Sequence, residues 1–216
     1  MTDFLGDPAV FLQRLVFQIP ALLIAVTVHE LAHALVADRL GDPTARRLGR
    51  ITLNPLPHID PLGAIAFVIA GFGWAKPVPV NAANLRHPRR DMAWVAAAGP
   101  LSNFLVAFLA LAILRFSASQ GLIAARSDAS AQILLFIYYF NLGIGIFNLI
   151  PLPPLDGGHF LPYLLPARAA GLVRAVEQYG AIILLLLVFS GATRWIVGPL
   201  FRWVDQFMSA VVRSLI

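Results

Sequence analysis

The sequence contains no cysteine, and it has few charged residues. Without cysteine, disulfides and thiolate metal sites are excluded, and the redox compartment cannot be inferred. Charged residues make up 12% of the 216 residues and hydrophobic residues 59%, whereas a soluble domain is about a quarter charged and about half apolar. With a mean hydropathy of +0.78, this composition is typical of a multi-pass membrane protein that forms one compact unit.

The N-terminus lacks the basic stretch of a signal peptide. Asp3 and Asp7 precede the first apolar run, and no small-residue cleavage site follows it, so we expect no cleaved signal. A net charge of +5 would also suit nucleic-acid binding. However, the basic residues cluster in short loops between apolar runs, which indicates membrane topology, and we therefore expect no nucleic-acid partner.

Four apolar runs are long enough to cross a bilayer, which takes about 20 helical residues. They cover residues 11–37, 92–114, 131–150 and 179–197. A fifth run, Leu62–Trp74, is shorter and holds three glycines, so we expect a re-entrant or interfacial segment. The tail 200–216 mixes charged and aromatic residues, which is typical of an interfacial helix. We therefore predict an all-α polytopic membrane protein in which residues 1–216 form a single domain.

The loop 39–90 carries eight of the 16 basic residues. The positive-inside rule places this loop in the cytoplasm, and we expect a protein of the prokaryotic cell membrane. Within the loop, "GRITLNP" and "KPVPVN" have the composition of extended chain, because Pro77 and Pro79 forbid a helix and suit an edge strand. We expect a small membrane-associated β-hairpin here.

The first apolar run contains the sequence "HELAH", which places His29, Glu30 and His33 at membrane depth. His29 and His33 are four residues apart, so they share one helix face and are able to bind one Zn²⁺. Glu30 is then close enough to act as general base on a water. This H-E-x-x-H spacing is characteristic of zinc hydrolases. Capping or core histidines are a poor alternative, because polar groups at this depth are rare and usually functional.

A catalytic zinc site needs a third protein ligand. The segment "FNLIPLPPLDGGHF" (147–160) interrupts the third apolar run with three prolines. Unwound chain at membrane depth lines a cavity or is packed within protein, so Asp156 is a candidate oxygen ligand. On spacing alone, Asp156 suits equally well the cap of a short helix that begins near Gly158.

Five motifs of the chain resemble, in order, those of the site-2 protease family of intramembrane zinc metalloproteases, peptidase family M50. They are "HELAH" (29–33), "LNPLPHIDPLG" (53–63), "GWAKPVPVN" (73–81), "AGPLSN" (98–103) and "NLIPLPPLDGG" (148–158). The resemblance implies that His29, His33 and Asp156 bind Zn²⁺ and that Glu30 activates water. It also implies that the substrate is a transmembrane segment of another protein. With 28 residues before His29 and no PDZ or CBS insert, the chain resembles the minimal branch of the family.

The same resemblance suggests roles for less specific residues. Asn148 would stabilise the oxyanion and Asn103 would bind substrate, but a structural interhelical hydrogen bond explains Asn148 equally well and Asn103 better. His58 is interpreted as structural or close to the substrate. A substrate segment would be held extended by strand addition to the proline-containing stretch. That stretch consists of Pro77, Val78, Pro79 and Val80.

Two other classes of function compete with the protease. A catalytically silent zinc-binding adaptor would not need Glu30, and a metal transporter would need acidic or histidine residues on several spans. We therefore favour a zinc endopeptidase whose active site lies toward the cytoplasm. We expect it to contact the lipid bilayer, and a regulatory membrane partner or a homo-oligomer is the further assembly to test.

Overall fold

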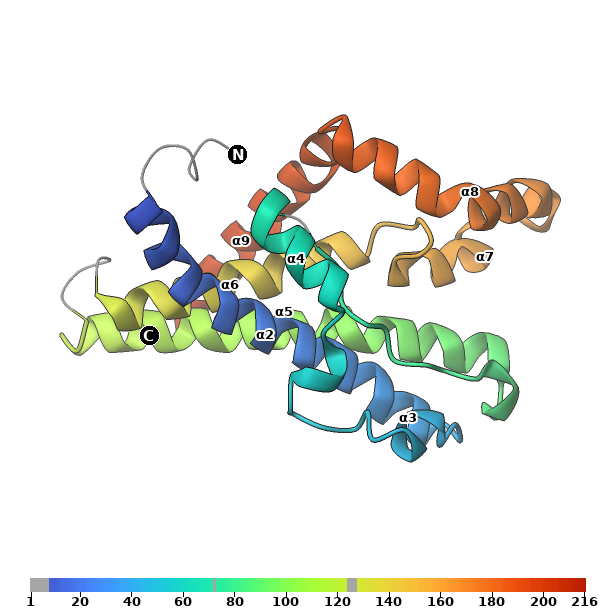
Figure 1. Cartoon of the computed structure of the whole chain (residues 1–216), viewed down its shortest axis with the longest axis horizontal. Coiled ribbons are helices and arrows are strands. Elements are labelled where there is room, and N and C mark those ends of the chain that lie inside the picture. Colours follow the sequence, from blue (N-terminus) through green and yellow to red (C-terminus); the bar gives the residue numbers. More distant parts are fainter. Residues whose placement is uncertain (1–7, 72, 124–127) are drawn as a thin grey trace.

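The computed structural model describes residues 8–71, 73–123 and 128–216 (Figure 1). The regular structure is helical, and no strand forms within these ranges. The α-helices are α2 (Pro8–Arg39), α3 (Thr44–Arg47), α4 (Pro61–Ala70), α5 (Pro88–Ser119), α6 (Ala129–Asn148), α7 (Leu161–Leu164), α8 (Ala170–Phe189) and α9 (Thr193–Leu215). Short 3-10 helices are η1 (Leu56–His58), η2 (Ala82–Asn84), η3 (Asp156–Phe160) and η4 (Ala167–Ala169).

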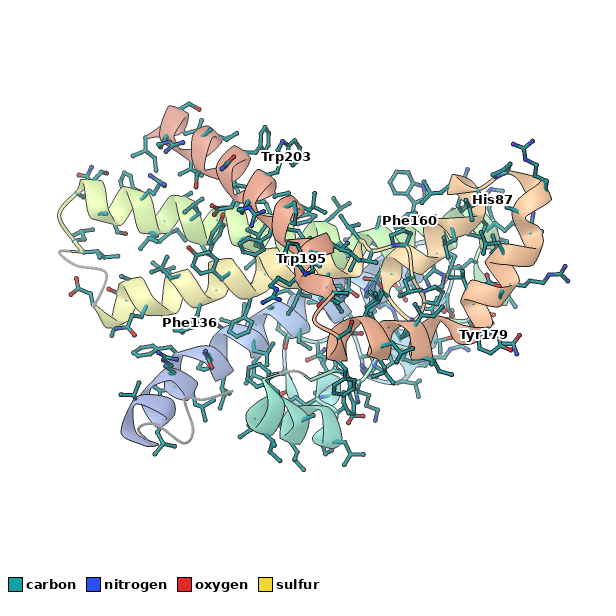
Figure 2. All side chains as sticks on the ribbon, turned by 90° about the horizontal axis from the view of Figure 1, so that it is seen from above. His87, Phe136, Phe160, Tyr179, Trp195 and Trp203 are labelled. Atoms are coloured by element: carbon teal, nitrogen blue, oxygen red, sulfur yellow. The ribbon has the colours of Figure 1, made fainter. Side chains whose placement is uncertain are left out.

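Four of these helices are long and apolar enough to cross a membrane. They are α2 from Arg14 to Arg39, α5, α6 and α8. Many large apolar side chains are exposed, including Leu105 and Ile113 of α5 and also Trp195 of α9, which is labelled in Figure 2. Apolar surface of this extent would be unfavourable in water and suits lipid contact. The predicted all-α membrane protein with about four spanning helices is confirmed.

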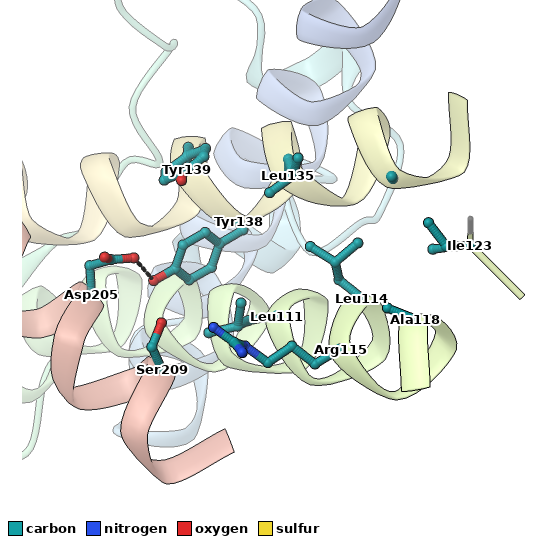
Figure 3. A pocket seen from close by; sticks show the side chains of 11 residues that line it. Leu111, Leu114, Arg115, Ala118, Ile123, Leu135, Tyr138, Tyr139, Asp205 and Ser209 are labelled. Carbon is teal, nitrogen blue, oxygen red and sulfur yellow. Dashed lines mark hydrogen bonds between the residues drawn. The ribbon is translucent and has the colours of Figure 1, made fainter. Parts of the chain in front are cut away.

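Helices α2, α5 and α6 pack side by side, and α9 lies against α5 and α6 (Figure 1). Leu111 of α5, Leu142 of α6 and Val212 of α9 belong to one buried cluster. Tyr138 of α6 belongs to the same cluster, and its hydroxyl donates a 2.6 Å hydrogen bond to Asp205 of α9 (Figure 3). These contacts attach the C-terminal helix to the central helices; the interfacial location of the tail stays a prediction.

The fourth spanning helix differs from its predicted position. The sequence predicts it over 179–197, whereas α8 already begins at Ala170 and ends at Phe189. A turn with Gly191 at φ 73° separates α8 from α9, because this left-handed conformation suits glycine and ends the helix. Arg174 and Glu177 lie exposed in the first half of α8, before the predicted run begins.

The predicted re-entrant segment is the helix α4. It has ten residues, too few to cross a bilayer, which takes about 20. The Asp60 carboxylate caps its start by accepting hydrogen bonds from the N–H groups of Leu62 and Gly63. Gly71, at φ 69°, ends it. The structure thus has a short capped helix here, and a re-entrant path is not confirmed.

The predicted β-hairpin does not form in the described residues. A single antiparallel bridge joins Ile59 to Ala75, and the chain after it is extended without a partner strand. Pro77 and Pro79 have no N–H to offer a ladder. The carbonyls of Lys76 and Pro77 are bound by the Arg50 side chain instead of a strand. Side-chain hydrogen bonds therefore replace the expected sheet pairing.

Candidate metal centre

Three ligand atoms from two distant segments converge between α2 and η3. The Nε2 atoms of His29 and His33 lie 3.0 Å from each other. The Oδ2 atom of Asp156 lies 3.0 Å from the first and 3.3 Å from the second. Helix α2 brings the two imidazoles to one face, and the chain after α6 brings the carboxylate to them. These residues are the one group of metal-ligating side chains found in the parts of the chain that the structure describes.

Hydrogen bonds on the far side of each imidazole determine which nitrogen faces the centre. Nδ1 of His29 lies 2.6 Å from Oδ1 of Asn103, and Nδ1 of His33 lies 2.7 Å from the carbonyl oxygen of Val95. Both partners are acceptors, so in the neutral ring each Nδ1 carries the proton. Each Nε2 then presents a lone pair to the centre.

The donor set fits Zn²⁺. Two imidazole lone pairs and a carboxylate oxygen would repel one another at these distances without a cation between them. Asp156 Oδ2 is buried and has no hydrogen-bond partner, which is rare for a buried polar atom and fits an oxygen that coordinates a metal. Ligands about 2.0–2.1 Å from a tetrahedral zinc lie about 3.3 Å apart, close to the separations of the three atoms. These three residues would leave one position of a four-coordinate zinc to water or substrate, as catalytic zinc sites require.

Asp156 was also a candidate for a helix cap. It is the first residue of η3, and the cap position before it makes no side-chain hydrogen bond. Its Oδ2 atom lies 3.0 Å from Nε2 of His29 and 3.3 Å from Nε2 of His33. The carboxylate is therefore directed at the two histidines and does not cap the short helix.

Close approach of α5 to the histidines depends on Gly99. A Cβ atom added there would lie 2.4 Å from Nε2 of His33 and 2.6 Å from Cε1 of His29. No side chain fits at such distances, so only glycine lets the α5 backbone pass this close. Asn103, one turn further along α5, then reaches His29.

Glu30 lies beside His29 and is 7% exposed. Its Oε2 atom accepts a 2.8 Å hydrogen bond from the backbone N–H of Val78. The stretch predicted to bind substrate therefore passes directly over the predicted general base. The sequence does not predict this contact, because a backbone amide leaves no sign in the residue type.

The other predicted site residues lie in different surroundings. Asn103 is fully buried, and its amide nitrogen donates to the Ala25 carbonyl and to Asn141. Both hydrogens of this amide are therefore bound to groups of the protein itself. Asn148 ends α6 and donates to the carbonyl of Ile144 in its own helix. No hydrogen bond joins Asn148 to the three ligands within the described residues. Substrate contact by either asparagine stays a prediction.

His58 is not a fourth ligand in this arrangement. It is fully buried, its Nε2 lies 3.1 Å from the carbonyl oxygen of Thr52, and its Nδ1 lies 3.5 Å from Nη2 of Arg50. Both ring nitrogens thus have protein partners, in agreement with the structural alternative. The contacts of Asn141 with Asn103 and of Arg50 with His58 were not predicted from the sequence. Asn141 did carry a usable signal, because it is a polar residue inside an apolar run.

Comparisons with known proteins agree with this chemistry. The family model described as peptidase family M50 matches residues 17–132 and 117–190. YwhC of Bacillus subtilis, named as a candidate zinc metalloprotease, is 39% identical over 202 residues, covering 93% of this chain and 91% of YwhC. Rip2 of Mycolicibacterium smegmatis, named in the same way, is 31% identical over 186 residues, covering 80% of this chain and 67% of Rip2.

Rip2 of Mycobacterium tuberculosis H37Rv, also named as a candidate zinc metalloprotease, is 30% identical over 207 residues, covering 92% of this chain and 77% of that protein. No solved structure matches the chain significantly. The family match extends over most of the chain and includes the helix with both histidines and the segment with Asp156. The chain therefore belongs to peptidase family M50, the site-2 protease family, and is a zinc-dependent metalloprotease of the membrane.

Proposed function

We propose that this enzyme is an intramembrane endopeptidase that cleaves transmembrane segments of other membrane proteins, as in regulated intramembrane proteolysis. The proposal rests on one observation: His29 and His33 lie within a helix long and apolar enough to span the membrane, and Asp156 meets them there. A protease whose reacting groups lie at membrane depth meets its substrate in the membrane.

In this proposal, His29, His33 and Asp156 hold the metal. When bound, zinc supplies Lewis-acid polarisation of the scissile carbonyl and lowers the pKa of water to about 7. The Glu30 carboxylate accepts the proton of the attacking water and later donates it to the leaving amide nitrogen. Asn148 donates a hydrogen bond to the oxyanion. Asn103 is reassigned from substrate binding to the orientation of His29, since its amide is engaged there.

The substrate is held extended along Pro77–Val80. The N–H of Val80 and the carbonyl of Val78 make no hydrogen bond within the described residues. Free backbone groups on extended chain are what strand addition uses. A helical substrate must first unwind, because its carbonyls are engaged in i to i−4 hydrogen bonds.

We further propose the membrane topology. Residues 1–216 form one protease domain in the cell membrane, with the basic loop 39–90 in the cytoplasm. His29 precedes Arg39 by ten residues (39 − 29), so at 1.5 Å per residue it lies roughly 15 Å from the cytoplasmic face. Water then reaches the site from that side. The partners are the substrate, the lipid bilayer, and either a regulatory membrane protein or a second copy of the chain.

The test is cleavage of a single-span membrane protein in vesicles that contain the purified enzyme. Replacing Glu30 by Gln keeps the shape of the side chain and removes the base, so we expect cleavage to fall about 10²–10⁴-fold with bound zinc retained. Glu177→Gln changes the chain's other glutamate, which is exposed on α8, and should leave cleavage unchanged. Unchanged cleavage by Glu30→Gln, or cuts confined to soluble loops, would contradict the proposal.

A further inference from the structure

A buried arginine in the loop after α3 binds the extended stretch that passes over Glu30. Arg50 is 6% exposed. Its Nη2 donates to the carbonyl oxygen of Lys76 at 2.6 Å, and its Nη1 donates to that of Pro77 at 3.1 Å. Two successive backbone carbonyls are thus bound by one planar guanidinium, whose fixed fork suits paired oxygen acceptors.

His58 holds this arrangement from the other side. Its Nε2–H donates to the Thr52 carbonyl at 3.1 Å, so Nδ1 is left as the acceptor that faces Nη2 of Arg50 at 3.5 Å. The backbone carbonyl of His58 also accepts a 2.9 Å hydrogen bond from the Lys76 N–H. We call Arg50 and His58, with the backbone of Lys76 and Pro77, the Arg50 clamp.

The Arg50 clamp ends one residue before the amide that contacts Glu30. The Val78 N–H donates to Oε2 of Glu30 at 2.8 Å. Pro77 has a rigid φ and its carbonyl is bound by Arg50, so the peptide unit that carries the Val78 N–H has little freedom to rotate. The position of the Glu30 carboxylate is therefore connected, through a short piece of backbone, to the Arg50 guanidinium.

We propose that Arg50 is a positioning residue for catalysis: through the carbonyls of Lys76 and Pro77 it holds the Val78 amide where this amide orients the Glu30 carboxylate. The proposal rests on the role of Glu30 in the proposed function. A misplacement of a reacting group by about 1 Å can lower a rate by about 10²-fold, so loss of the clamp acts on turnover.

The charges of Arg50, in this loop, and Glu30, in α2, also interact. Burial lowers the pKa of the Arg50 guanidinium, and the negative charge of Glu30 opposes this shift. The negative charge of Glu30 therefore favours the charged form of Arg50, in addition to their connection through Val78. An arginine that only supported the loop would not need to lie in range of the general base.

The experiment compares Arg50→Gln with Arg46→Gln in the vesicle cleavage assay, measuring kcat, KM and bound zinc. Arg46 lies four residues earlier, in α3, and its exposed guanidinium pairs with Asp38. We expect Arg50→Gln to lower kcat about 10–100-fold with zinc retained, as is usual for groups that orient a metal site's residues. KM should change by less than about threefold, because substrate binding is not the step affected. Arg46→Gln should match the wild type.

Arg50→Lys is the second variant, for the case that Arg50→Gln does not accumulate as zinc-loaded protein. An ammonium group cannot bind both carbonyls in one plane, so we expect kcat to fall about tenfold. Wild-type kcat in the zinc-loaded Arg50 variant, or a raised KM with unchanged kcat, would overturn the proposal. Glu30→Gln in the same assay separates the two ideas. If Glu30→Gln stays active, Glu30 is not the base and the proposed function is contradicted. If Glu30→Gln is inactive but Arg50→Gln is fully active, only the positioning role of Arg50 is contradicted.

Discussion

Oδ1 of Asn103 lies 2.6 Å from Nδ1 of His29, across the contact between α5 and α2. The amide nitrogen of Asn103 donates to Ala25 and Asn141, so the amide group cannot turn over without losing both bonds. A histidine held in this way at Nδ1 presents only Nε2 to a metal. Helix packing thereby selects Nε2 as the nitrogen of His29 that would bind the proposed metal.

Replacing Asn103 by Ala should weaken zinc binding about 10–100-fold, because the imidazole of His29 loses the acceptor that orients it. The measurement is competition for zinc with a chelator of known affinity. Asn148→Ala is the matched control, since among the described residues its amide donates to Ile144 of its own helix, and it should keep wild-type zinc affinity. Equal affinities of Asn103→Ala and the wild type would refute the orienting role.

Removal of the third ligand has a larger expected effect. Asp156→Ala leaves two imidazoles for the metal, and we expect the purified protein to lose most of its zinc and its cleavage activity, because a catalytic site needs three protein ligands. Metal content of the purified variant is the direct measurement. Asp205→Asn alters a carboxylate bound to Tyr138 at the contact of α6 with α9 and should retain zinc. Full zinc occupancy in Asp156→Ala would remove Asp156 from the site.

Gly99→Ala tests the close contact between α5 and the ligands. The new methyl group would overlap the imidazole of His33, so α5 must move away, and we expect reduced zinc occupancy and a lower Tm. Gly143→Ala in α6 is the control, because nothing lies within 4 Å of its added Cβ. Alanine in place of an unrestricted helical glycine should stabilise by about 0.5–1 kcal/mol. A Gly99→Ala variant with wild-type Tm and zinc content would show that the helices lie further apart.

The buried carboxyl of Asp42 should make the free energy of unfolding depend on pH. It is fully buried. Burial alone would raise its pKa, but hydrogen bonds from Asn84, Thr44 and Asn81 outweigh burial and lower it. A carboxyl whose folded pKa is depressed stabilises the fold above its unfolded pKa of about 3.9, and this stabilisation is lost as the pH falls through the folded pKa.

The measurement is thermal unfolding of the wild type and Asp42→Asn across pH. At pH 7 the variant should be less stable by about 1–3 kcal/mol, because its amide nitrogen would face the Asn81 N–H. The difference should shrink as the pH falls below about 4, because the carboxyl of the unfolded chain is protonated first and that of the folded protein only at a lower pH. A difference that stays constant down to acid pH would indicate that the charge of Asp42 is not involved.

Much of the fold was predictable because its signals are local. Runs of about 20 apolar residues identify spanning helices without tertiary information, and α2, α5 and α6 lie over the predicted runs. The fourth span was predicted too far along the chain, because an apolar run begins only after Arg174 and Glu177, whereas α8 includes both residues. The β-hairpin was wrong for the described residues, because a side chain, Arg50, binds the carbonyls that a second strand was expected to use.

The sequence by itself determined the membrane class, the pairing of His29 with His33 on one helix face, and the neighbouring Glu30, since helix periodicity relates residues four apart. Only the tertiary structure decided what meets that face. Asp156, Gly99 and the Val78 amide come from segments far along the chain, and spacing does not restrict how such segments pack. Two of the proposed metal ligands therefore follow from the helix periodicity of α2, whereas the third depends on how the chain after α6 packs against α2.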